Sequence, residues 1–216
     1  MSEADLEAIG LLQDAARRSL YAYVVGQGRE VSRNEAAEAI GMQRTLAAFH
    51  LDRLASAGLL EVTFRRLTSR SGPGAGRPAK LYRRPSTERS VSLPPRDFAR
   101  LASVLAETVE RCGAEVSLYQ TARARGIAEG NSLARGLEEE LAERGYEPYQ
   151  DEGAVRLRNC PYHSVAQEFP VVACGMNLAL LEGLLQGSGL AETYEARIDP
   201  RPGECCVVLA SKTNPA

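Results

Sequence analysis

The sequence lacks the motifs that mark the common hydrolases, nucleotide-binding proteins and zinc ribbons. It contains no GxSxG elbow, no glycine-rich phosphate loop and no HExxH pair. It also contains no CxxC knuckle, which argues against an ordinary zinc ribbon. These absences favour a protein that is not an enzyme. An enzyme built on Cys160 and His163, either a hydrolase or a thiol oxidoreductase, is the alternative from that class.

A long hydrophobic run and a leader are missing as well. No apolar stretch approaches the ~18 residues that a transmembrane helix needs. The first five residues, MSEAD, are acidic, whereas a signal peptide begins with positive charge. We therefore expect a cytoplasmic protein with no membrane partner. Hydrophobic residues make up 44% of the chain, which is enough for a globular core.

Charge is spread unevenly along the 216 residues. Residues 1–85 hold thirteen Lys and Arg against nine Asp and Glu, whereas residues 86–216 hold thirteen against nineteen. A basic first part joined to an acidic second part is typical of a nucleic-acid-binding module that is followed by a sensing or assembly module. Chance segregation of charge is the alternative.

A helix, a tight turn and a second helix are predicted near the N-terminus. Ser32 and Glu35 form a capping box, which opens a short helix over 34–40. The turn 41–43 leads into a second helix over 44–57, and a glycine follows its end. This order of elements is that of a helix-turn-helix.

The second helix has two distinct faces. At ~100° per residue, Ala47, Leu51 and Leu54 fall on one face. His50 lies at the edge of that face, so we assign it to the scaffold. The opposite face is small, polar and cationic, and such a face fits the major groove of DNA; an ordinary amphipathic helix is the alternative. It holds Thr45, Ala48, Phe49, Asp52 and Arg53, with Arg44 in the first turn.

A basic hairpin is predicted directly after the helix-turn-helix. Residues 60–64 and 79–83 have the pattern of strands, and residues 69–78 are rich in Gly and Pro, as a loop is. The segment 61–85 carries seven basic residues against one acid, Glu61. A basic hairpin with a glycine-rich tip at this position is typical of the wing of a winged helix. A solvated basic hairpin is the alternative.

Two runs in this region resemble a known family. FHLDRL at 49–54 and GRPAKLY at 76–82 are similar to bacterial winged-helix regulators of the ArsR type, and most to the branch of the SufR iron–sulfur repressors. The resemblance implies that the second helix reads the bases of a double-stranded operator, while the hairpin contacts the DNA backbone or minor groove. Gln43 stands where the family often has a Ser cap, which implies a weaker helix start or different base contacts. The predicted DNA-binding residues are Gln43, Arg44, Thr45, Ala48, Phe49, Arg53, Arg77 and Lys80.

The rest of the chain is predicted as a linker, a helical layer and a small α+β domain. A helical layer after the linker would form a dimer interface or an intramolecular helix pair. The expected domains are 1–85, the winged helix; 86–145, the linker and dimerisation segment; and 146–216, the sensor domain. The expected helices outside the helix-turn-helix are 4–25, 97–112, 118–144 and 171–186, and the expected C-terminal strands are 154–158, 193–198 and 205–210.

Four of the five cysteines gather in the last third of the chain. Thirteen residues separate Cys160 from Cys174, and thirty separate Cys174 from the pair Cys205 and Cys206. In a cytosolic chain such clustering favours metal or redox chemistry over structural disulfides, and buried structural cysteines are the alternative. The family resemblance implies an iron–sulfur cluster at these residues, with zinc as the alternative. Cys112 lies on a helical stripe elsewhere, so we assign it to a core.

The predicted strand over 205–210 limits which of the cysteines can bind a metal together. Neighbouring side chains on a strand face opposite ways, so one of Cys205 and Cys206 is expected to ligate. Three thiolates then need a fourth donor or an open iron. His163, about one helical turn after Cys160, is the candidate, with an exposed or hydrogen-bonded histidine as the alternative.

These observations together predict an α+β protein with an N-terminal winged helix-turn-helix, a helical dimer layer and a small C-terminal cysteine domain. The predicted function is that of a homodimeric DNA-binding transcriptional regulator, and more specifically a repressor, whose C-terminal cysteines sense an iron–sulfur cluster or redox state. A regulator that senses zinc or thiol oxidation without a cluster is one alternative. An adaptor that uses its winged helix for protein contacts is the other.

Overall fold

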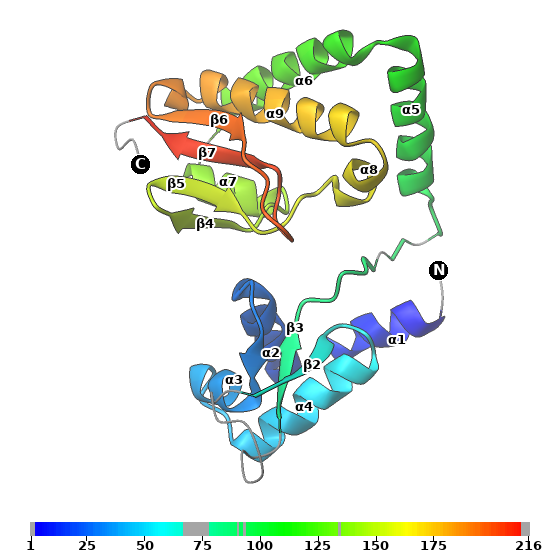
Figure 1. Ribbon diagram of the computed structural model, residues 1–216, viewed down its shortest axis with the longest axis vertical. Helices are drawn as coiled ribbons and strands as arrows, with labels where there is room; N and C mark the ends of the chain where they lie inside the picture. The colour runs from blue at the N-terminus through cyan, green and yellow to red at the C-terminus, as the bar shows by residue number, and fades with distance from the viewer. Residues whose placement is uncertain (1–2, 67–77, 90, 93, 134, 213–216) are drawn as a thin grey trace. The chain divides into compact units, whose positions relative to one another are not determined.

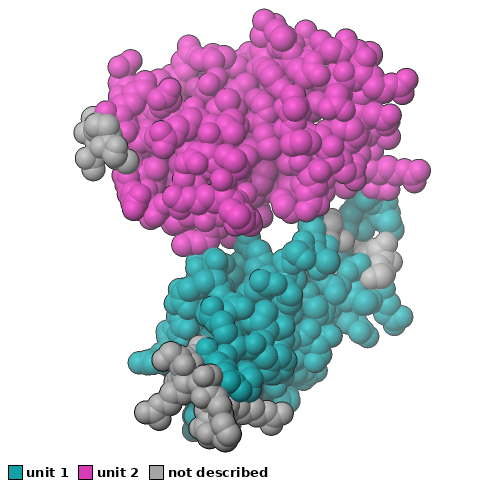
Figure 2. Space-filling model, in the orientation of Figure 1, with its two compact units in different colours: residues 1–96 teal, residues 97–216 magenta. Residues whose placement is uncertain are grey.

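The computed structural model describes residues 3–66, 78–89, 91–92, 94–133 and 135–212. The chain divides into two compact units, residues 1–96 and residues 97–216, which are coloured separately in Figure 2. We call them the N-terminal unit and the C-terminal unit. Each contains helices and an antiparallel sheet, so the predicted α+β class is confirmed. Residues 97–145 belong to the same unit as the cysteine-bearing residues that follow them.

The N-terminal unit packs its helices around a small sheet (Figure 1). In its three-stranded sheet β3 lies between β1 and β2, with Val31 opposite Tyr82 and Thr63 opposite Leu81. Leu20 and Leu54 are among the fully buried side chains between the helices. The elements are α1 (Glu3–Leu11), α2 (Ala15–Gly26), β1 (Val31–Ser32), α3 (Arg33–Ala39), α4 (Arg44–Ser56), β2 (Glu61–Arg65) and β3 (Ala79–Arg83).

The predicted helix over 4–25 is wrong, because the chain forms two helices there. Asp14 stands outside the second helix in an extended conformation, and its carboxylate accepts a hydrogen bond from the Arg17 backbone N–H at 3.0 Å. An aspartate that satisfies a free N–H in this way starts a new helix. The apolar stripe continues across the break, which is why hydrophobic periodicity alone did not reveal it.

The predicted capping box of the helix-turn-helix is confirmed. The Ser32 hydroxyl accepts from the Glu35 backbone N–H at 3.2 Å. Arg29 pairs with the Glu35 carboxylate at 2.5 Å, and this pairing, with a smaller contribution from the Ser32 backbone N–H, holds the pKa of Glu35 below its usual value. The side chains of Ser32 and Glu35 together therefore determine where α3 begins.

The C-terminal unit contains a four-stranded antiparallel sheet in the order β4-β5-β7-β6. Helix α9 packs on strands of this sheet and also runs alongside α6 (Figure 1). The core includes the fully buried Leu181, Leu184 and Leu209. The elements are α5 (Phe98–Cys112), α6 (Glu115–Gly130), α7 (Leu137–Glu143), β4 (Pro148–Asp151), β5 (Ala154–Leu157), α8 (His163–Glu168), α9 (Pro170–Gly187), the 3₁₀ turn η1 (Leu190–Glu192), β6 (Tyr194–Ile198) and β7 (Val207–Ser211).

The structure of this unit differs from the sequence-based expectation at three places. The helix expected over 118–144 is two helices, and the chain leaves the first after Gly130, in keeping with the low helix propensity of glycine. Strand β4 was not predicted; it pairs with β5 across a two-residue turn in which Glu152 and Gly153 have positive φ. The last strand begins at Val207, so Cys205 and Cys206 precede it.

Helices α6 and α9 meet backbone to backbone at glycines. A Cβ atom added at Gly126 would lie 2.1 Å from the Leu180 carbonyl oxygen. One added at Gly183 would lie 2.2 Å from the carbonyl oxygen of Arg123. No real Cβ approaches this closely, so the crossing depends on residues that have none.

Helix α9 is relevant to the prediction that the chain contains no membrane-spanning segment. Within the described residues it is the one helix that is long and apolar enough, by length and composition, to cross a membrane, so the expectation of no such segment is not met. Half of its residues are buried inside the protein, and the core helix of a soluble protein passes the same test. Its interior also contains Glu182 and the fully buried Asn177.

Candidate functional site

The apolar face of α4 anchors that helix to the N-terminal unit. Ala47, Leu51 and Leu54 are fully buried, as their spacing predicted. His50 is 8% exposed, and its Nδ1 atom has no hydrogen-bond partner among the described residues. Burial on this face agrees with the assignment of His50 to the scaffold.

The opposite face of α4 is exposed apart from Ala48. Gln43 precedes the helix without capping it through its side chain, and the backbone amides of the first turn remain open to other acceptors. Phe49 is 54% exposed, and the Arg53 guanidinium lies 5.7 Å from the centre of its ring. Arg44 forms no ion pair with any other described residue. Gln43, Arg44, Thr45 and Arg53 are exposed, and Ala48 is half-buried beside them.

The Asp52 carboxylate joins α4 to strand β3. It accepts from the Lys80 ammonium at 2.5 Å and from the Tyr82 hydroxyl at 2.6 Å. Burial alone would raise the pKa of Asp52, but the hydrogen bonds from Lys80 and Tyr82 outweigh it and lower the pKa. Lys80, predicted to contact DNA, is thus partly neutralised in the free protein.

Other cations of the hairpin also have acidic partners. Arg83 pairs with Glu61 at 3.0 Å across the two strands. Arg65 lies 3.3 Å from Glu30. The positive charge expected of this hairpin is therefore reduced by ion pairs within the unit. Arg77 and most of the predicted loop 69–78 lie outside the described residues.

A second candidate site forms where four thiols from three segments meet. Cys160 follows β5, Cys174 lies in the second turn of α9, and Cys205 and Cys206 directly precede β7. The Cys205 backbone N–H donates to the Leu157 carbonyl at 2.9 Å, which brings this segment beside the end of β5. All four are free thiols; Cys205 is buried and the other three are partly buried. The structure thus brings together all four cysteines that the sequence singled out.

The mutual interactions of these thiols order them as Cys160, Cys205, Cys206 and Cys174. Hydrogen bonding to the Cys205 thiol lowers the pKa of Cys160, and it lowers that of Cys206 to about 6. The same bonds, together with burial, raise the pKa of Cys205. Burial, followed by the contact with Cys206, raises the pKa of Cys174 to about 12. Cysteines whose pKa is lowered thus alternate along this row with cysteines whose pKa is raised.

The argument from strand alternation does not apply to this pair, because Cys205 and Cys206 lie before the strand. Both take part in the row of thiols. The exposed His163 does not: its Nε2 atom lies 3.1 Å from the Gln167 amide nitrogen one turn along α8. Cys112, predicted to be a core residue, is exposed at the end of α5, so that assignment is wrong.

A buried hydrogen-bond chain leads to the thiols. The Asn177 amide nitrogen donates to Cys205 Sγ at 3.3 Å, and the Tyr146 hydroxyl donates to the Asn177 amide oxygen at 2.6 Å. Burial raises the pKa of Tyr146, with a smaller contribution from the neighbouring Tyr162, so this hydroxyl stays protonated. Sequence reasoning missed Asn177; its one signal was an amide within the apolar run of residues 170–187.

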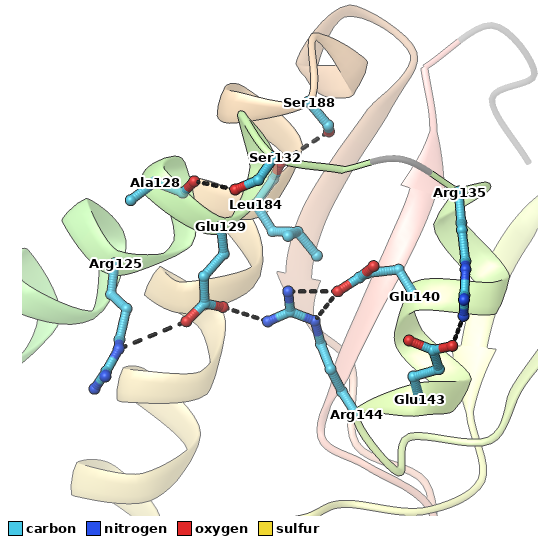
Figure 3. Close-up of polar contacts among 10 residues, drawn as sticks. All are labelled: Arg125, Ala128, Glu129, Ser132, Arg135, Glu140, Glu143, Arg144, Leu184 and Ser188. Carbon is cyan, nitrogen blue, oxygen red and sulfur yellow. Dashed lines mark hydrogen bonds and ion pairs between the residues drawn. The ribbon is translucent and has the colours of Figure 1, made fainter.

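A cavity of about 390 Å³ borders the same tyrosines. Its wall includes Arg144, which pairs with Glu129 of α6 and with Glu140 of α7 (Figure 3). Arg125 lies 3.5 Å from the same Glu129 carboxylate. These ion pairs hold α7 against α6 and so support the segment that carries Tyr146.

The donor set of the thiol site fits a thiophilic metal or an iron–sulfur cluster, since cysteine thiolates are the usual ligands of both. In the described part of the chain, however, no group of three or more His, Cys, Asp or Glu side chains is arranged so that it could hold a metal ion. The thiols contact one another in pairs, so the four sulfur atoms would have to move closer together to bind a single cation.

Comparisons with protein-family profiles, with curated proteins and with solved structures find no match to this chain.

Proposed function

We propose that the protein is a homodimeric DNA-binding transcriptional regulator of the winged-helix type, and specifically a repressor. The observation that carries the proposal is the exposed front of α4, which follows a capped α3 and a tight turn and is followed by an antiparallel hairpin. A helix presented in this way can enter a major groove while the hairpin lies along the backbone.

The side chains of α4 support the assignment to DNA. Arg44 and Thr45 occupy its first turn, the part that reaches base edges first in such a module. Arg44 has its charge available, and a bidentate contact of arginine with guanine is the commonest specific contact in the major groove. Phe49 offers an apolar surface for a thymine methyl group.

The four thiols support a sensing role for the C-terminal unit. We assign Cys160, Cys174, Cys205 and Cys206 as the ligands of an iron–sulfur cluster. Bound as thiolates close together, they would repel one another, and a cation offsets that repulsion. A bound cluster supplies redox and oxygen sensitivity at this site. Zinc in place of the cluster is the alternative that the same ligands permit.

Helix α5 supports the assignment of a second copy as partner. Its apolar stripe includes Phe98, Leu101 and Leu105, and Leu101 is 55% exposed. An exposed apolar stripe of this kind marks a protein-contact surface, and we assign a second copy of the chain to it.

Selection of bound sequences from random duplex DNA, followed by mobility shifts at several salt concentrations, tests DNA binding. We expect a two-fold symmetric operator and an affinity that falls steeply with salt. Binding that shows no sequence preference, or no binding to duplex DNA, would contradict the proposal. An adaptor function predicts the second result.

Anaerobic purification tests the cofactor separately. We expect a brown protein with iron and sulfide, whose visible absorbance is lost in Cys160→Ser and Cys174→Ser and kept in Cys112→Ser. A colourless, iron-replete protein that binds zinc stoichiometrically would replace the cluster with zinc. Neither outcome alters the test of DNA binding.

A further inference from the structure

Asn177 is an isolated polar residue in the buried part of α9. It has no exposed surface, and the buried residues near it on the helix, Ala173, Leu180 and Leu181, are apolar. A buried amide is unfavourable unless both its donor and its acceptor are bonded, and leucine would fill a similar volume without that cost. An asparagine here therefore calls for a role beyond packing.

The amide of Asn177 is held in one orientation. Its Oδ1 atom accepts from the Tyr146 hydroxyl at 2.6 Å, which leaves the Nδ2 group directed at Cys205 Sγ, 3.3 Å away. Tyr146 is 1% exposed and Cys205 is 2% exposed, so water does not compete for these bonds. Tyr146 thus fixes the oxygen end of the amide, and the nitrogen end meets the sulfur.

We propose that Asn177, oriented by Tyr146, is a positioning residue that holds the sulfur of Cys205 in place as a ligand of the four-cysteine metal site. This inference rests on the proposed function of that site. It identifies a definite role for Cys205 that the sequence left open between the two adjacent cysteines.

The bond is stronger in the metal-bound state than in the free thiol. When a metal cation binds, Cys205 releases its proton to solvent and becomes a thiolate, and a hydrogen bond to a charged acceptor is stronger than one to a neutral acceptor. The N–H group therefore favours the bound state. Partners of this kind orient metal ligands, and hydrogen bonds to ligand sulfurs tune the properties of the metal.

Anaerobic titration of the full-length protein with Co²⁺ alone tests the inference, because thiolate-to-cobalt charge-transfer absorption reports bound sulfur. Asn177→Leu removes the donor and the acceptor, whereas Asn177→Asp keeps the acceptor for Tyr146 and puts a carboxyl oxygen in place of the N–H donor. We expect both variants to bind Co²⁺ about 10- to 100-fold more weakly. Their charge-transfer band should move to longer wavelength, because the sulfur lone pair loses its hydrogen bond.

Ser188→Ala is the matched control, because the Ser188 hydroxyl lies at the end of the same helix and donates to the carbonyls of Leu184 and Leu185. It should leave both affinity and band unchanged. Tyr146→Phe keeps the N–H but frees the amide to rotate, so we expect a smaller loss of affinity. If neither Asn177 variant folds, Tyr146→Phe provides the test. An unchanged Co²⁺ affinity and charge-transfer band in Tyr146→Phe would then overturn the inference.

Two results separate the inference from the function on which it rests. Wild-type affinity and an unshifted band in both Asn177 variants would overturn the role of Asn177 alone. A wild-type protein that binds no Co²⁺ would overturn this role together with the metal-sensing part of the proposed function.

Discussion

Asp52 gives the candidate DNA-binding surface its definite geometry. One carboxylate binds a lysine and a tyrosine of β3, and so fixes the hairpin against the helix that would read bases. The spacing of charges in the sequence did not reveal this pair, because Lys80 is twenty-eight residues away along the chain. The pairing gives Lys80 a structural role in the free protein, and contact with DNA would have to compete with it.

Acid should destabilise the N-terminal unit through Asp52. Its pKa lies below the ordinary 3.8, so the stability that it contributes is present above about pH 4 and is lost as the pH falls through the lowered pKa. Unfolding by urea, measured across this range, should show the difference between wild type and Asp52→Asn shrinking toward low pH. In the Lys80→Ala background the pH-dependent part should be smaller. A difference that stays constant with pH would contradict this role.

Arg44→Ala should relax base preference at one or two positions of the operator. If Arg44 binds guanine through two hydrogen bonds, each affected position should lose about 1–3 kcal/mol of discrimination. Competition between operator variants that differ by a single base pair measures this loss. Uniform weakening across all variants would place Arg44 on the phosphate backbone instead.

Lys80→Ala should weaken binding to all sequences alike. If Lys80 leaves Asp52 to neutralise one phosphate, the dependence of log affinity on log salt should become shallower by about one unit. Mobility shifts at several salt concentrations measure the slope. An unchanged slope would mean that Lys80 stays bound to Asp52 in the complex and serves only to hold the hairpin.

At the scale of helices, the crossing of α6 and α9 depends on glycines spaced by one turn. Gly126 and Gly130 on α6 meet the backbone of α9, and Gly183 and Gly187 on α9 meet that of α6. Because these positions carry no side chain, the two backbones come into direct contact, and the helices pack without large side chains between them. Asn177 and Cys174 lie on the same helix, so the position of α9 also sets that of the thiol site.

Gly183→Ala should destabilise the C-terminal unit. The added Cβ would lie 2.2 Å from the Arg123 carbonyl oxygen, and relief requires the two backbones to separate. Overpacking of this kind costs about 1–3 kcal/mol or more. Urea unfolding measures the loss, and Gln120→Ala, on the exposed face of α6, should stay within about 0.5 kcal/mol of wild type. Equal stability of the two variants would mean that the helices can move apart freely.

The elements that the sequence predicted well are those with local signals. The capping box of Ser32 and Glu35, the buried face of α4 and the glycine that follows it depend on neighbours a few residues away. Hydrophobic periodicity joined α1 to α2 and α6 to α7, because the apolar stripe continues across breaks that capping residues and glycine impose.

The thiol site could be predicted only in part. Its cysteines were recognisable by their clustering, but their order depends on the pairing of β5 with the segment before β7, which joins residues almost fifty positions apart. Asn177 carries no motif, and only its burial beside a sulfur reveals it. The exposure of Cys112 likewise depends on how α5 packs against the rest of the unit, and the hydrophobic pattern of α5 alone does not predict that packing.

At the scale of the whole molecule, a sensing unit influences DNA binding most simply through the distance between two recognition helices. A dimer binds two half-sites one helical turn apart, so a small change in that distance alters operator affinity strongly. Binding of a cluster would join Cys160, Cys174 and the segment of Cys205 into one rigid body. The α5 helices are placed to carry that change, because they belong to the same unit and directly follow the linker.

Leu101→Glu should convert the protein from a dimer to a monomer. Leu101 lies within the exposed stripe of α5, and in the proposed dimer its new carboxylate would be buried against the apolar face of the second copy. Sedimentation equilibrium measures the change in mass. Operator affinity should fall by roughly 10²-fold or more, because the second half-site no longer adds its binding.

Ile198→Glu, which changes another exposed apolar side chain of the same unit, is the control for this loss. It should leave both mass and affinity unchanged, since β6 is not part of the proposed interface. A Leu101→Glu protein that remains dimeric would place the interface elsewhere and leave the apolar face of α5 to another contact.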